Sequence, residues 1–169
     1  MTDFTAEPLS RESLMEVAAR TYYTIDGLWF LAVEEAFGFE KAFELNQSVW
    51  KKAGPILARR LLKHIDTEGK HPLQILMEVL LTDPLASVHH PHVVELTERK
   101  AVFRCIDCPI QVARIRDGRG VYNGIPGCTI CNAAYARAVD ERITTRCVAC
   151  ASNPDNPEYW CEWVFELPE

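Results

Sequence analysis

The sequence of 169 residues lacks any apolar run long enough to cross a membrane, which takes about 18 or more consecutive apolar residues. Its N-terminus, MTDFTAEPLSRES, also lacks the basic stretch and the apolar stretch that make a secretory signal. These two absences predict a cytoplasmic protein with no membrane partner. Disulfides are rare in that compartment, so cysteines there need another explanation.

An excess of positive charge is missing as well. The formal net charge is −6 and the isoelectric point is about 5.4. A surface that binds phosphate backbones is basic, so the charge argues against a nucleic-acid partner. The chain is 48% hydrophobic and 25% charged, as soluble globular proteins are, and its length suits a single domain spanning 1–169.

The common catalytic motifs are absent too. There is no G-x-S-x-G elbow and no H-E-x-x-H helix. The segment GRGVYNG lacks the lysine and the preceding strand that a phosphate-binding loop needs. No motif therefore assigns the chain to an enzyme class, and whether it is an enzyme stays open.

What the sequence does contain is cysteine, clustered in its second half. Six of the seven form three C-x-x-C pairs, CIDC, CTIC and CVAC. Clustered pairs in a reducing compartment indicate metal or redox chemistry rather than a disulfide framework. A single pair is often only buried apolar packing, but three pairs so close together make that reading weak.

The pattern of apolar residues predicts an α+β fold. Residues 1–82 have helical periodicity, and the expected helices begin after Ser10 and then cover 26–37, 39–65 and 72–81. The cysteine-rich part, 88–169, predicts the order β-β-α-α-β-β with an antiparallel sheet. A turn-rich loop, SNPDNPE, is expected before the last strand.

The spacing of the last cysteines predicts a four-cysteine metal site. Cys147 and Cys150 supply two ligands from one tight turn, and Cys161 returns on the neighbouring strand. Cys128 is the best-placed fourth ligand, because it is expected to open a helix, with Cys131 as its substitute. Zinc is the expected metal, and an iron–sulfur cluster is the alternative that spacing leaves open.

The remaining pair, Cys105 and Cys108, has two interpretations. It is either a buried apolar pair at a strand end or a reactive pair. Cys108 lies at a strand-to-helix turn, where a helix N-terminus lowers the pKa of a thiol, so it is the candidate nucleophile.

Two further groups are weaker signals. The tract HHPH, with His89, His90 and His92, is interpreted as a surface lead-in to a strand rather than a set of metal ligands. Among the aromatic residues, Trp29 and Tyr135 are the candidate contacts for a small molecule, because each combines an apolar ring with a polar tip.

The C-terminal segment CTICNAAYARAVDERITTRCVACASNPDNPEYWCEWVFEL resembles the 4-vinyl-reductase-like small-molecule-binding domain. Phenol-sensing domains of that superfamily carry a zinc site, and the resemblance places its ligands at Cys128, Cys147, Cys150 and Cys161. The whole chain resembles a prokaryotic family related to L-2-amino-thiazoline-4-carboxylic acid hydrolase, through DGLWFLAVEEAFGFEKAFELN, CPIQVARIRDGRG, ARAVDERITTRCVAC and YWCEWVFEL. This second resemblance implies an α+β ligand-binding fold and a homodimer formed through the N-terminal helices.

Three functions follow as hypotheses. The first is a zinc-stabilised domain that binds or senses a small molecule. The second is a small hydrolase of a cyclic amide or thiazoline-type substrate with Cys108 as nucleophile, which rests on family analogy. The third is an iron–sulfur or thiol redox protein.

Overall fold

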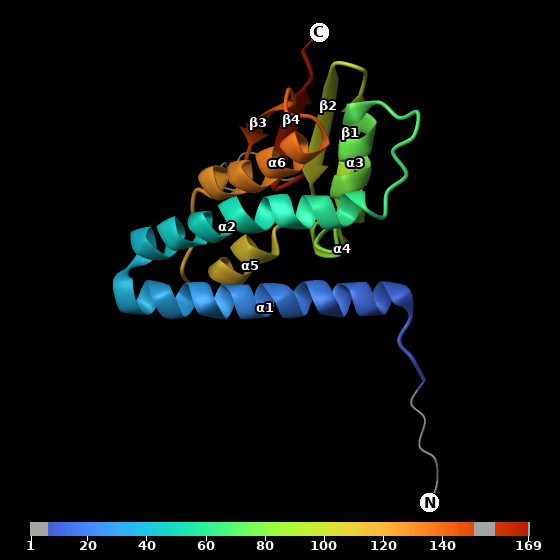
Figure 1. The fold of residues 1–169 in the computed structure, drawn as a ribbon. Helices are drawn as coiled ribbons and strands as arrows, with labels where there is room; N and C mark the ends of the chain where they lie inside the picture. The colour runs from blue at the N-terminus through green and yellow to red at the C-terminus, as the bar shows by residue number, and fades with distance from the viewer. Residues whose placement is uncertain (1–6, 151–157, 169) are drawn as a thin grey trace, which may run out of the picture.

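The fold is that of a computed structural model, which describes residues 7–150 and 158–168. It is an α+β structure in which helices precede a four-stranded antiparallel sheet, as the sequence predicts (Figure 1). The elements are α1 (Arg11–Phe37), α2 (Phe39–Leu62), α3 (Pro72–Thr82), α4 (Ala86–His89), β1 (Pro91–Leu96), β2 (Lys100–Cys105), α5 (Pro109–Arg116), α6 (Ile125–Val139), β3 (Thr144–Ala149) and β4 (Cys161–Glu166).

The N-terminal helices differ in one respect from the expectation. Ser10 caps α1 as predicted, its Oγ accepting the N–H of Ser13 at 3.1 Å. The helix does not end before residue 26, however, and the two expected helices form one of 27 residues. The separate helix start that the sequence predicts at residue 26 is therefore wrong. Gly38, with φ of +85°, makes the turn into α2.

The helix α2 runs through Gly54 and Pro55, where the sequence predicts a kink or a restart. It ends at Leu62, three residues before the expected end. The helix α3 agrees with the expectation, with Pro72 in its first turn and His71 as its cap. The short helix α4 lies between α3 and β1, where the sequence pattern predicts no helix.

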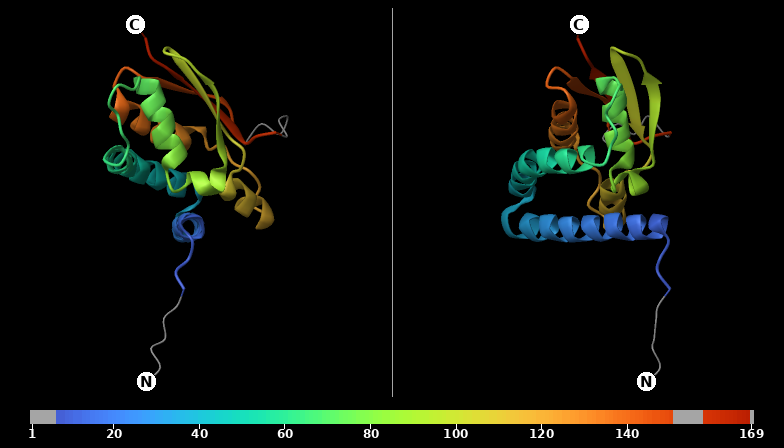
Figure 2. Two further views of the ribbon diagram at one scale, coloured as in Figure 1. Left: turned by 90° about the vertical axis from the view of Figure 1, so that its right-hand side faces the viewer. Right: turned by 45° about the vertical axis from the view of Figure 1, so that its right-hand side comes forward.

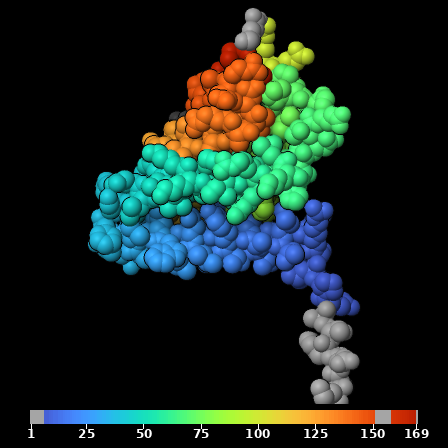
Figure 3. Space-filling model, in the orientation of Figure 1, coloured from blue at the N-terminus to red at the C-terminus, as the bar shows by residue number. Residues whose placement is uncertain are grey.

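The sheet has the strand order β1-β2-β4-β3, and all three neighbouring pairs are antiparallel. The helices α3 and α6 pack on the same side of it, and Figure 2 shows the other side without a covering helix. The helix α2 lies across α6, and α1 forms the outermost layer beneath (Figure 3).

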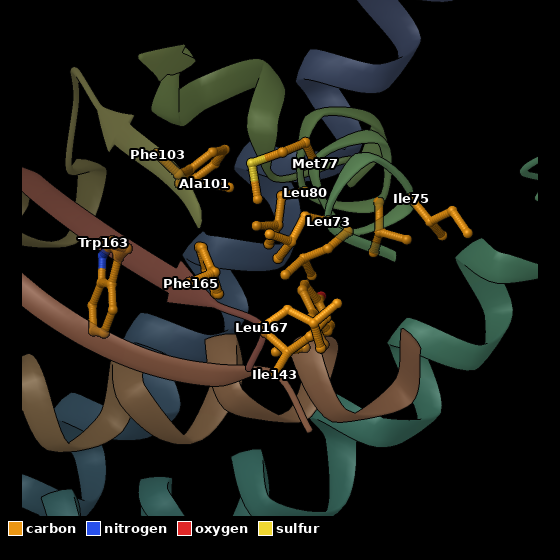
Figure 4. Packing of buried hydrophobic residues seen from close by; sticks show 14 of the residues in the cluster. Leu73, Ile75, Met77, Leu80, Ala101, Phe103, Ile143, Trp163, Phe165 and Leu167 are labelled. Atoms are coloured by element: carbon orange, nitrogen blue, oxygen red, sulfur yellow. The ribbon is translucent and has the colours of Figure 1, made fainter. Parts of the chain in front are cut away.

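The core fills the space between the sheet and these helices (Figure 4). Trp163 and Phe165 of β4 are almost fully buried there, in the same cluster as Leu73 and Leu76 of α3. The same inner face of β4 carries Cys161, because side chains two residues apart on a strand point to the same side. The core therefore continues into the cysteine region at one end of the sheet. The expected loop SNPDNPE lies, apart from Glu158, outside the described residues.

Candidate functional site

The first pair of cysteines is fixed by strand register. Cys105 ends β2 and Cys161 begins β4, and the two residues are direct partners across the antiparallel pair. Their thiols are hydrogen-bonded to each other. Trp163 donates its indole N–H to Sγ of Cys161 at 3.2 Å. The sheet thus holds these two sulfurs next to each other.

A second pair lies on the strand at the other side of β4. Cys147 of β3 pairs with Trp163 in register, and a bulge follows between Cys147 and Ala149. This irregularity turns the chain so that the thiols of Cys147 and Cys150 form a hydrogen bond. The backbone oxygen of Ala149, 3.2 Å from Sγ of Cys147, is a second acceptor for the same S–H, which can donate to one of the two at a time. The predicted C-x-x-C pair is therefore brought together locally.

Two further cysteines come from helices. Cys108 is the residue that caps α5, as the sequence predicts. Cys128 was expected to open its helix, but α6 begins at Ile125, so the N–H of Cys128 already bonds to Gly124 at 3.0 Å. The sequence analysis missed that start because Pro126 and Gly127 are poor helix formers in a helix interior.

The six thiols lie close enough to shift one another's pKa. Burial raises the pKa of Cys108 to about 12, and the nearby thiols of Cys161 and Cys150 add to the shift. The pKa of Cys128 is also raised, first by desolvation and then by Cys108 and Cys161. Cys128 is accessible to solvent on one side, so this desolvation comes from the protein around the rest of the thiol. The expected lowering by a helix N-terminus is outweighed at both positions.

The pKa of Cys161 is lowered instead. Hydrogen bonds from the Cys105 thiol and from the Trp163 indole stabilise its thiolate more than burial penalises it. We refer to six of the seven thiols as the thiol cluster. It consists of Cys105, Cys108, Cys128, Cys147, Cys150 and Cys161. The seventh, Cys131, adds to the shift of the Cys128 pKa, but no other thiol shifts its own pKa.

Cys131, the predicted substitute ligand, lies next to Tyr135 of the same helix. Its thiol is hydrogen-bonded to Tyr135, and burial raises its pKa to about 12. Tyr135 is buried and donates its hydroxyl to the carboxylate of Asp83. The structure therefore places Cys131 and Tyr135 together in a polar contact beneath α3, apart from the paired thiols.

The donors of the thiol cluster suit a soft metal. All six are sulfur, which favours zinc, iron–sulfur clusters or copper(I) over magnesium or calcium. Across residues 7–150 and 158–168, no three His, Cys, Asp or Glu side chains already converge on one point as a ligand set. Four of the thiols instead form two hydrogen-bonded pairs, and Cys108 and Cys128 lie near these pairs. The residue types fit zinc, and ligation would require the sulfurs of the two pairs to approach a common centre.

One polar chain was missed by the sequence analysis. His89 is partly buried, and its Nε2 is 2.6 Å from the hydroxyl of Tyr23 in α1. Its Nδ1 is 2.8 Å from the backbone oxygen of Asp107, so Nδ1 carries the proton and Nε2 accepts from Tyr23. His90 and His92 are exposed, as expected of the tract. Only the tertiary contact between α1 and α4 distinguishes His89 from its neighbours.

The other predicted ligand contact lies at the surface. Trp29 is 71% exposed on α1, so it contributes to no interior pocket of the described chain. A hollow of about 380 Å³ is found elsewhere, between the first turns of α1 and the α3–α4 junction. Arg11, Met15 and Asp83 are among its lining residues. None of the thiols lines it.

No helix within the described part of the chain has the length and apolar character needed to cross a membrane. A family model, described as a family of unknown function (DUF6125), matches residues 7–167. No curated protein and no solved structure gave a match. The match extends over both the helical part and the thiol cluster, and the chain therefore belongs to this family of unknown function.

Proposed function

We propose that the chain is a zinc-stabilised, small-molecule-binding domain in which the thiol cluster holds the metal. The observation that carries the proposal is the gathering of six of the seven cysteines at one end of the sheet. They come from β2, β3, β4 and the first turns of α5 and α6. A metal bound there would tie together elements that are distant in sequence.

The chemistry of the cluster supports a structural role for the metal. A closed site of four thiolates leaves no open position for a substrate, and such sites are usually structural. Zinc supplies folding free energy in that setting, because the site does not exist in the unfolded chain. The chain itself positions the sulfurs: the indole of Trp163 holds Cys161, and the bulge after Cys147 brings Cys147 and Cys150 together.

The small-molecule part of the proposal rests on the surface hollow. Its volume of about 380 Å³ lies in the range of small-molecule sites, which are about 300–1,000 Å³. Arg11 provides a positive charge in a mainly apolar lining, which suits a ligand with an apolar body and a polar group. We expect ligands from a panel of such compounds to raise the melting temperature. Met15→Trp, which fills the hollow, should abolish the increase.

We also propose a homodimer through α1. Five exposed apolar residues of this helix fall within one stripe at 3.6 residues per turn. They are Leu14, Val17, Ile25, Leu28 and Trp29. Each is more than half exposed, with Trp29 the most exposed at 71%. A second copy of the same stripe is the covering surface with matching chemistry.

The test of the metal is its content in protein purified without oxygen and without a metal-binding tag. We expect about one zinc per chain and no visible absorption. Protein that is folded and carries no metal would contradict the proposal. Iron with a broad visible band would support an iron–sulfur protein in its place.

The thiol redox alternative is favoured by one contact, the direct pairing of Cys105 with Cys161. Protein purified without oxygen and without a metal-binding tag also distinguishes the thiol redox protein from the zinc protein. A metal-free protein whose mass falls by two hydrogens on mild oxidation by a disulfide reagent would indicate a reversible disulfide there. No corresponding contact supports the hydrolase: in the described ranges no imidazole or carboxylate is hydrogen-bonded to Cys108, whose pKa is raised to about 12.

A further inference from the structure

We propose that Cys105, rather than Cys128, is the fourth zinc ligand, so that the site is formed by Cys105, Cys147, Cys150 and Cys161. This inference rests on the proposed zinc binding and names the residues that perform it. It departs from the ligand set that the sequence spacing and the family resemblance imply, in which Cys105 has no role.

Four of the thiols are arranged in two pairs. In a tetrahedral zinc site with Zn–S distances of about 2.3 Å, any two sulfurs are separated by about 3.8 Å. Two thiols that share a hydrogen bond lie at a similar separation. Cys105 with Cys161, and Cys147 with Cys150, are such pairs. The six edges of a tetrahedron form three opposite pairs, and the two thiol pairs would supply the two edges of one such pair.

The strand β4 lies between β2 and β3 in the sheet. Cys105 and Cys161 are register partners, and Cys147 is the register partner of Trp163, which is two residues from Cys161 on the same face. All three thiols therefore point to the side of the sheet covered by helices. Cys150 follows directly after β3 and is buried. The sheet therefore brings Cys105, Cys147 and Cys161 to the same end and the same face, and Cys150 is paired with Cys147 there.

Cys128 lacks both features. It belongs to a helix rather than to the sheet, and in the described part of the chain its thiol makes no hydrogen bond with another cysteine. It is also the most exposed of the seven cysteines. Its largest interaction with another thiol is with Cys108, the other cysteine left outside the two pairs.

The movement needed for binding is confined to one pair. The register of β2 and β4 holds Cys105 and Cys161, whereas the bulge leaves Cys147 and Cys150 at a less regular site. The thiol of Cys147 must give up its hydrogen bond to the Ala149 oxygen and lose its proton. The sulfurs of Cys147 and Cys150 can then turn toward those of Cys105 and Cys161. The bound metal would link the ends of β2, β3 and β4.

The experiment compares single Cys→Ser variants of the full chain, loaded with zinc and then with cobalt(II). Cys105→Ser should weaken zinc binding by more than about 100-fold, because even residues that only support ligands cost 10–100-fold when changed. It should also lower the intensity of the thiolate-to-cobalt band. Cys128→Ser and Cys108→Ser should keep wild-type affinity and spectrum. Cys131→Ser, which removes a thiol from the same helix outside the cluster, is the matched control.

Each result bears on the proposal. Loss of binding in Cys128→Ser with retention in Cys105→Ser would overturn it in favour of the ligand set implied by the resemblance. Loss in both, or in neither, would also overturn it. If Cys105→Ser fails to fold, Cys105→Ala and the cobalt spectrum of Cys128→Ser decide, since an unchanged four-thiolate spectrum excludes Cys128 as a ligand. A wild-type protein without metal would refute the proposed function itself, which is a separate outcome.

Discussion

At the scale of single residues, the contact between Tyr135 and Asp83 shows how a buried charge is accommodated. Tyr135 is 3% exposed and Asp83 is 9% exposed, and the tyrosine hydroxyl donates to one carboxylate oxygen. The other oxygen accepts the N–H of Leu85 at 2.8 Å. Both donors are needed, because a buried carboxylate without partners is strongly unfavourable.

Tyr135→Phe should therefore lower the free energy of unfolding by about 1.5–3 kcal/mol, the range for hydrogen bonds to charged groups. Urea unfolding of wild type and variant measures the difference. Tyr22→Phe is the matched control, since Tyr22 is 39% exposed and its hydroxyl makes no hydrogen bond within the described ranges. Its effect should stay within about 0.5 kcal/mol. Equal losses in both variants would contradict the role assigned to Tyr135.

His89 provides a prediction about pH. Burial lowers its pKa below the usual 6.5, so the folded chain holds it neutral while the unfolded chain binds a proton more readily. Its contribution to stability is complete above pH 6.5 and is lost as the pH falls from there toward the lowered pKa. His89→Gln should remove this loss, which thermal melts from pH 7.5 to 5 would detect as a shallower slope than in wild type.

The exposed His92, changed to Gln, should leave the slope as it is in wild type. Comparing variants at each pH cancels any contribution of the metal, which all three proteins share. A slope in His89→Gln as steep as in wild type would show that the Tyr23–His89–Asp107 chain has no part in the acid sensitivity.

At the scale of elements, the crossing of α2 and α6 is the closest helix contact that a substitution can probe. A Cβ placed on Gly54 would lie 2.8 Å from Cβ of Ala134, too close for either short side chain to give way. Gly54→Ala should therefore destabilise the protein by about 1–3 kcal/mol through overpacking, despite the better helix propensity of alanine.

Gly27→Ala in α1 is the control for that propensity. Nothing lies within 4 Å of a Cβ at Gly27, so this change should raise stability by about 0.5–1 kcal/mol. Chemical unfolding of both variants gives the comparison. Stabilisation by both changes would mean that α2 and α6 are not packed as closely as described.

The elements were predictable where local chemistry decides them. Ser10, Pro72 and Pro109 mark helix starts correctly, and the alternation of apolar residues predicts the hairpin and the last strands. The continuity of α1 through residue 26 was missed because it depends on packing against α2, which local sequence does not reveal. The pairing of Cys105 with Cys161 was missed because register between strands 56 residues apart is a tertiary property.

At the scale of the whole molecule, the apolar stripe of α1 predicts the oligomeric state. Leu28→Glu places a charge in its middle and should convert a dimer into a monomer of 19.2 kDa in light scattering after gel filtration. Leu96→Glu, at an exposed apolar position on the far end of the sheet, should leave the dimer intact. A wild-type protein that stays monomeric at all concentrations would contradict the proposed interface.

The central claim is that sulfur alone binds a zinc ion in this protein. X-ray absorption at the zinc edge, measured on the full chain as purified, tests it most directly. We expect four sulfur neighbours at about 2.3 Å and no nitrogen or oxygen neighbour. A shell with nitrogen or oxygen ligands at about 2.0–2.1 Å, or a protein with no bound zinc, would contradict it.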